Sequence, residues 1–179
     1  MKKQTFAVAA AFTLIGSVAF AQDVKVDFDK DANFTTIKTF ALKVGTSWDN
    51  PLSEKRVTGE IEQALTEKGW TKAGDATADA IVVLHGATQV KKDLNTFYSG
   101  GYSGYGWHGM GGMGSSSTTV SEYTVGTLVV DIFDAKSKEL LFRGTASDEL
   151  SDKVEKNQKK LAKASDKMFK DFPPGSGKK

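Results

Sequence analysis

Residues 122–144 read EYTVGTLVVDIFDAKSKELLFRG, and this stretch decides how the rest of the chain is arranged. Apolar side chains occupy both faces around 128–133, which is typical of a strand covered on both sides within a sheet. Residues 134–138 supply turn chemistry, and Leu140-Leu141-Phe142 returns as a second strand. The pattern therefore predicts a hairpin at the centre of a sheet.

An amphipathic helix follows the hairpin. We expect it to begin at Ser151 or Asp152 and to end at Pro173, which cannot continue a helix. The side chains that recur at spacings of four and three, and so share one side, are Val154, Gln158, Leu161, Ser165, Met168 and Phe172. Lysines mixed with acidic residues cover its other faces, which is more typical of a solvated surface than of an anion-binding face. The helix is predicted to pack over the hairpin.

Three earlier segments are predicted to be strands. Polar and apolar residues alternate in 24–28 and again in 34–42. Residues 80–84 form a continuous apolar run, typical of an interior strand, which we expect to continue to about Val90. A helix capped by Ser53 lies between the second and the third of these segments.

That helix also has a clear end. Gly69 fits the left-handed position after the C-terminus, and Trp70 can then pack on Leu65. Together these elements predict an α+β fold: a mostly antiparallel five-stranded sheet in the chain order ββαβββα, with two helices packed on one face. We expect a single domain over residues 22–174 and a flexible tail over residues 175–179.

The N-terminus has the features of a secretory signal peptide. Lys2 and Lys3 form a positive region, residues 6–20 form an apolar one, and Ala19-Phe20-Ala21 is a small-x-small cleavage signal. The apolar run is shorter than the roughly 20 residues that span a bilayer, so an uncleaved anchor is the weaker interpretation. Residues 1–21 are predicted to be removed on export.

The composition restricts the classes of function. The chain has 24 basic and 22 acidic residues, and two of the lysines lie in the predicted signal peptide, so the mature protein is neutral by count. Neutrality is not typical of a general nucleic-acid binder, and we expect no nucleic-acid partner. The chain contains no cysteine, which excludes thiol catalysis, cysteine-bound metals and lipidation of an N-terminal cysteine.

A glycine-rich segment with interspersed aromatic residues occupies about 98–117. It matches neither the dinucleotide-binding nor the Walker A phosphate-binding pattern. Glycine lets a backbone adapt to a target, and Tyr and Trp offer contact area at little cost in conformational entropy. The candidate partner-binding residues are therefore Tyr102, Tyr105, Trp107 and His108, with an envelope protein or a glycan as the partner. The alternative is a flexible hairpin loop with no function of its own.

The chain carries no recognisable catalytic or metal-binding pattern. Its histidines are His85, on the apolar strand, and His108, in the glycine-rich segment, and no G-x-S-x-G motif is present. Asp27, Asp29 and Asp31 have calcium-loop spacing, but the glycine and glutamate that such a loop needs further on are missing. We therefore predict no catalytic residues, no cofactor and no metal.

Five short motifs follow one another along the chain: the strand at 24–28, FTTIKTF at 34–40, GTLVVD at 126–131, LFRGTA at 141–146 and FPP at 172–174. Their order and spacing resemble the bacterial domain-of-unknown-function family 4136. The resemblance covers about residues 24–174, and it implies an envelope protein with an antiparallel sheet and packed helices, without an assigned activity, cofactor or catalytic residue. Many relatives are lipoproteins, whereas this chain lacks the cysteine that would be acylated. Membrane anchoring is therefore not carried over from the relatives. Phe142 stands where relatives often have Trp.

The sequence thus predicts an exported, non-enzymatic binding or scaffolding domain of the cell envelope. We expect it in the periplasm or outside the cell, with no stable membrane anchor after signal cleavage. One alternative is an envelope hydrolase that uses His85 or His108 with a carboxylate. Another is a purely structural or stress-related envelope protein.

Overall fold

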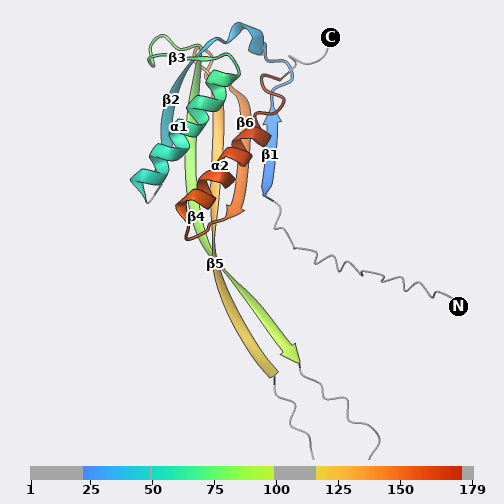
Figure 1. Ribbon diagram of the computed structural model, residues 1–179. Coiled ribbons are helices and arrows are strands. Elements are labelled where there is room, and N and C mark those ends of the chain that lie inside the picture. The colour runs from blue at the N-terminus through green and yellow to red at the C-terminus, as the bar shows by residue number, and fades with distance from the viewer. Residues whose placement is uncertain (1–21, 49, 99–115, 175–179) are drawn as a thin grey trace, which may run out of the picture.

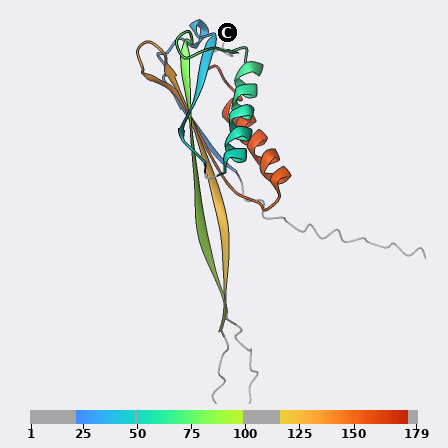
Figure 2. The same ribbon diagram turned by 90° about the vertical axis from the view of Figure 1, so that its left-hand side faces the viewer.

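The computed structural model of the protein describes residues 22–48, 50–98 and 116–174, so the predicted signal peptide and tail lie outside it. In the described part, an open six-stranded sheet carries two α-helices on one of its faces (Figure 1, Figure 2). Neither helix is long and apolar enough to cross a membrane. The elements are β1 (Asp23–Phe28), a 3-10 helix (Phe34–Thr36), β2 (Thr39–Thr46), α1 (Pro51–Glu67), β3 (Thr71–Lys72), β4 (Ala80–Tyr98), β5 (Ser116–Asp134), β6 (Leu140–Glu149) and α2 (Val154–Met168).

The sheet is mixed, with the strand order β1-β6-β5-β4-β2-β3. The pairs β1–β6, β6–β5 and β5–β4 are antiparallel, whereas β2 runs parallel to both β4 and β3. The predicted five-stranded sheet in the order ββαβββα is therefore wrong in its strand count and order. The reason is the short strand β3, which adds a sixth member after α1 and makes the chain order ββαββββα. The parallel pairing of β2 with β4 arises because α1 carries the chain back so that β4 starts at the same end as β2.

The segment predicted as a strand over residues 34–42 is divided in two. The Asn33 side chain accepts a hydrogen bond from the Thr35 N–H at 3.2 Å and so caps the 3-10 helix. This turn buries the side chains of Phe34 and Ile37. Only after it does β2 begin, because the capping asparagine offers the backbone an alternative to the sheet.

The central hairpin is confirmed. β5 lies between β4 and β6, as expected for a central strand. The expectation that both of its faces are covered is wrong, because both α-helices pack on the same face of the sheet. The Asp134 carboxylate accepts hydrogen bonds from the N–H groups of Lys136 at 2.7 Å and Ser137 at 2.8 Å, which holds the turn before β6. These hydrogen bonds lower the pKa of Asp134, the one from Ser137 most strongly.

The predicted end of α1 is also confirmed. Gly69 has a φ of +88°, its N–H donates to the Thr66 carbonyl at 2.9 Å, and the Trp70 N–H donates to the Leu65 carbonyl at 3.1 Å. These two bonds make up a Schellman motif. The start differs from the prediction, because Asn50 caps the helix instead of Ser53.

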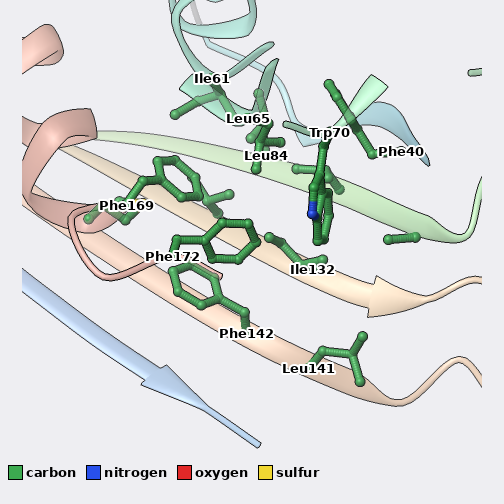
Figure 3. Packing of buried hydrophobic residues seen from close by; sticks show 14 of the residues in the cluster. Phe40, Ile61, Leu65, Trp70, Leu84, Ile132, Leu141, Phe142, Phe169 and Phe172 are labelled. Atoms are coloured by element: carbon green, nitrogen blue, oxygen red, sulfur yellow. The ribbon is translucent and has the colours of Figure 1, made fainter. Parts of the chain in front are cut away.

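The core lies between the helices and the sheet (Figure 3). α1 contributes Val57, Ile61 and Leu65, and α2 contributes Ala164, Ser165 and Met168. α2 begins at Val154, slightly later than predicted. Aromatic rings fill the end of the core beyond the C-terminus of α2, where Phe142, Phe169 and Phe172 meet. The two α-helices therefore cover one face of the sheet, and the other face carries no helix.

Candidate functional site

Two strands extend far beyond the rest of the sheet. β4 and β5 stay paired from Ala80 opposite Asp134 as far as Tyr98 opposite Ser116. β2 leaves β4 at His85, and β6 leaves β5 at Val125. The nine pairs from Val90–Thr124 to Tyr98–Ser116 therefore form a ribbon of two strands. We call this ribbon, residues 90–98 and 116–124, the arm.

The arm projects away from the body of the protein (Figure 1, Figure 2). At about 3.4 Å per residue, nine residues extend on the order of 30 Å. Val90 and Val120 are 60% and 53% exposed. A Lys92–Glu122 ion pair of 2.6 Å links the two strands. The arm thus presents apolar side chains to solvent at a distance from the core.

The predicted partner-binding residues belong to the segment that the arm carries. Residues 99–115 lie outside the described structure, so Tyr102, Tyr105, Trp107 and His108 remain predictions. Both strands that lead to this segment are described up to its borders. The last described pair, Tyr98 opposite Ser116, forms the tip of the arm and flanks this segment in the sequence.

Close packing shapes the base of the arm on the helix-covered face. The indole of Trp48 lies directly on Gly86, where a Cβ atom would stand 2.1 Å from the ring. The side chain of Leu150 lies on Gly126 in the same way, because a Cβ atom added to Gly126 would stand 2.9 Å from it. Only glycine leaves room for these two side chains, because any larger residue would displace them.

A cavity of about 290 Å³ opens beside these contacts. The sheet contributes Leu128 and Ala146, and the first turns of α1 and α2 contribute Ser53 and Val154. Most of the lining is apolar. The cavity lies between the helices and the sheet, and its lining residue Gly126 is two residues from Thr124, where the arm begins.

Of the two basic side chains that line this cavity, Lys160 has hydrogen-bond partners and Arg56 has none within the described residues. Lys160 donates to Asp148 at 3.0 Å and to the Glu149 carbonyl at 2.6 Å, and is thereby satisfied. Arg56, on α1, is half-buried. It makes no hydrogen bond or ion pair with any other residue of the described ranges.

A second polar cluster lies on the sheet face opposite the helices. Both oxygens of the Asp131 carboxylate accept hydrogen bonds from Arg143, each at 2.6 Å. The Nδ1 of His85 lies 3.0 Å from the Thr46 hydroxyl, and its Nε2 lies 3.9 Å from Asp131. The last distance is too long for a hydrogen bond, so Asp131 does not orient the imidazole as a catalytic base requires.

The arginine of this cluster is held as a cation. Hydrogen bonding to Asp131, and then its negative charge, raise the pKa of Arg143. The pair bridges β5 and β6 directly, since Asp131 and Arg143 are cross-strand neighbours. Its geometry is that of a structural ion pair.

The three aspartates with calcium-loop spacing do not converge on a common point. Asp27 accepts from the N–H of Phe28, and Asp29 accepts from the N–H of Asp31, both at 2.9 Å. Within the described residues, no group of three or more His, Cys, Asp or Glu side chains is arranged to hold a metal ion.

Glu60 lies between the helices in an unfavourable electrostatic setting. Burial raises the pKa of this carboxyl group above its ordinary 4.5, and the charges of Asp166 and Glu67 raise it further. The folded state therefore binds the Glu60 proton more tightly than the unfolded state does. Stability due to this group is present at low pH and is lost as pH rises above about 4.5.

We therefore expect Glu60→Gln to stabilise the protein at pH 7, by no more than about 1 kcal/mol because the side chain is only partly buried and water screens these charges. The gain should disappear at pH 4, where the wild-type group is mostly protonated. Urea unfolding at the two pH values measures the difference. An equal gain at both would contradict this account.

Sequence reasoning missed three features of these sites. The cavity brings together residues from α1, α2 and the sheet that no local pattern connects. The Asp131–Arg143 pair could have been found by counting outward from the turn at 134–138. The arm had a signal in the β-branched residues of 118–125, which favour a strand.

Comparisons with known proteins place the chain in a family. A search of curated proteins found no match. Among solved structures, a PDZ domain protein from Parabacteroides distasonis is 18% identical, with a TM-score of 0.53 over 86% of this chain. This chain spans only 36% of that protein's length.

Two further structures match at lower TM-scores. A DUF4136 family protein from Bacteroides thetaiotaomicron is 15% identical, with a TM-score of 0.47 over 85% of this chain and 96% of the other. The PelC dodecamer from Paraburkholderia phytofirmans is 12% identical, with a TM-score of 0.46 over 80% and 94%.

The sequence itself gives the family assignment. A family model described as "Domain of unknown function (DUF4136)" matches residues 24–174, which is nearly all of the described chain. This range agrees with the motifs that carried the resemblance. The chain belongs to the DUF4136 family.

Proposed function

We propose that the protein is an exported, non-enzymatic binding or scaffolding domain of the cell envelope that uses its arm to contact a partner. The observation that carries this proposal is the extension of β4 and β5 for nine pairs beyond every other strand of the described sheet. The packed body holds the base of the arm in place, and the arm extends the contact surface away from the body. The periplasm is the proposed location.

The physical cost of the arm supports this role. A two-stranded ribbon is only marginally stable in water when no third strand or packed layer supports it. It also exposes unpaired backbone groups along both edges, which are a template for pairing with another chain. Exposed Val90 and Val120 would be buried if a partner covered the ribbon.

The sequence that connects the two strands of the arm fits the same role. Tyr102, Tyr105 and Trp107 lie in the sequence between the two strands of the arm and can supply rigid aromatic contact area to a partner. Aromatic anchors commonly dominate the binding energy of an interface. The partner is an envelope protein or a glycan.

The experiment removes the arm without disturbing the body. Residues 92–122 are replaced by Asn-Gly, which joins the cross-strand neighbours Lys91 and Tyr123 through a two-residue hairpin turn. Affinity capture from cross-linked envelope extract should recover a defined partner with the intact protein and lose it with the shortened one. The melting temperature should change little, because the aromatic and aliphatic core lies in the body.

A triple substitution of Tyr102, Tyr105 and Trp107 by Ala should also abolish capture. The matched control replaces three exposed residues of the body, Lys30, Lys55 and Lys163, by Ala and should leave capture intact. Equal capture by the intact and shortened proteins would contradict the proposal. If the protein hydrolysed an ester, phosphate or glycan substrate and His85→Ala abolished that activity, the hydrolase alternative would replace the binding proposal.

A further inference from the structure

The cavity at the base of the arm is a candidate ligand site separate from the arm itself. Its volume of about 290 Å³ is close to the lower end of the range for small-molecule pockets, and it holds on the order of ten methylene-sized groups. Its walls come from three elements, α1, α2 and the sheet. The space between these elements is large enough for a small ligand but too small for a protein domain.

The interior of the cavity suits an aliphatic chain. Leu128 and Ala146 form the floor on the sheet, and Val57, Leu161 and Ala164 face it from the helices. Burying an aliphatic chain against such a surface is favourable by roughly 25 cal/mol per Å² of apolar area. The apolar lining therefore selects hydrocarbon over a polar metabolite.

The charge at the cavity suits an anionic head. Asp148 is the acidic side chain among the lining residues, and Lys160 already neutralises it at 3.0 Å. Arg56 remains as a half-buried cation without an ion-pair partner in the described chain. Glu60, one turn further along α1, makes no ion pair with it within the described ranges and instead faces the charges of Asp166 and Glu67.

We infer that this cavity binds a free fatty acid, with its hydrocarbon chain between the helices and the sheet and its carboxylate paired with Arg56. An arginine can bind a carboxylate through two parallel N–H···O hydrogen bonds, which are stronger than neutral ones. The cavity accommodates one chain of medium length. The two chains of a phospholipid exceed its volume.

The test uses three ligands that share a ten-carbon chain: decanoate, 1-decanol and decylammonium. Isothermal titration calorimetry measures affinity, and Trp48, which lines the cavity, gives a fluorescence signal. We expect saturable binding of one decanoate per protein, weaker binding of decanol and none of decylammonium. Equal affinity for all three, or no saturable decanoate binding, would overturn the inference.

Variants separate the head group from the chain. Arg56→Gln should weaken decanoate binding about tenfold or more and leave decanol binding unchanged. The matched control Lys55→Gln removes the neighbouring exposed charge of α1, which does not line this cavity, and should change neither. Equal losses from both variants would point to general electrostatics and overturn the assignment of Arg56.

A second variant fills the cavity. Ala146→Leu adds three carbon atoms to the floor, which should abolish decanoate binding while the melting temperature is kept or raised. Full affinity in a folded Ala146→Leu protein would place the ligand elsewhere. The protein with the shortened arm should still bind decanoate, so this test does not depend on the proposed role of the arm.

The source of the ligand is tested with phosphatidylglycerol vesicles. A free fatty acid as the ligand predicts no sedimentation of the protein with vesicles. Sedimentation that both Arg56→Gln and added decanoate abolish would overturn the free fatty acid in favour of a membrane lipid chain.

Discussion

Replacing Arg143 with Met is expected to lower the free energy of unfolding by about 3 kcal/mol, because it leaves a buried carboxylate without its counterion. Asp131 is 2% exposed, and Arg143 supplies the hydrogen bonds to both of its oxygens. Methionine keeps the aliphatic stem, so the loss reports on charge and hydrogen bonding more than on packing. Urea denaturation at pH 7 measures the effect.

The matched control is an exposed ion pair. Lys25 lies 3.2 Å from Asp23, with side chains that are 77% and 61% exposed. Lys25→Met should therefore cost less than about 1 kcal/mol. The double variant Asp131→Asn, Arg143→Met should be more stable than Arg143→Met alone, since it no longer buries an unpaired charge. An Arg143→Met loss as small as that of Lys25→Met would show that Asp131 does not depend on this partner.

Replacing Phe142 with Ala is expected to lower the free energy of unfolding by about 4 kcal/mol. Phe142 is 1% exposed and stacks on Phe169 with ring centroids 5.8 Å apart. Phe172 meets the same ring edge-on at 5.2 Å. Removal of the ring leaves a cavity among aromatic neighbours that are themselves fixed by the sheet and helices (Figure 3).

The control is the cross-strand neighbour of Phe142. Phe28 pairs with it in the β1–β6 register and is 40% exposed. Phe28→Ala should cost much less, on the order of 1 kcal/mol, because water already reaches the ring. Thermal and urea unfolding of the two variants make the comparison. Similar losses of unfolding free energy in the two variants would mean that the buried aromatic cluster contributes no more to stability than the exposed Phe28 ring.

These two residues illustrate how far sequence reasoning reached. The hairpin around Phe142 was predictable, since apolar residues on both faces of one strand and a polar turn specify a central position. The Schellman motif at Gly69 was predictable for a similar reason, because a left-handed glycine followed by an apolar residue is a local signal. Both depend on residues that are close together in the sequence.

The errors had two causes, a local cap that competes with the strand pattern and contacts between segments that are distant in the sequence. Residues 34–37 have an alternating pattern, but the Asn33 cap turns them into a 3-10 helix. The parallel pairing of β2 with β4 follows from the crossover through α1, which the alternation of apolar residues does not encode. The lining of the cavity combines residues of α1, α2 and the sheet, which are distant in the sequence, so no short pattern could identify Arg56.

The antiparallel pairing of β1 with β6 constrains the order in which the protein can fold. Asp23 lies opposite Ser147, so these strands come from nearly opposite ends of the described chain. The hairpins β4–β5 and β5–β6 instead join consecutive strands, and contacts between nearby segments cost less entropy and form sooner. As the polypeptide emerges during synthesis, β1 must wait without its partner until almost the whole chain has been made. The first strand to appear is thus the last that can join the sheet.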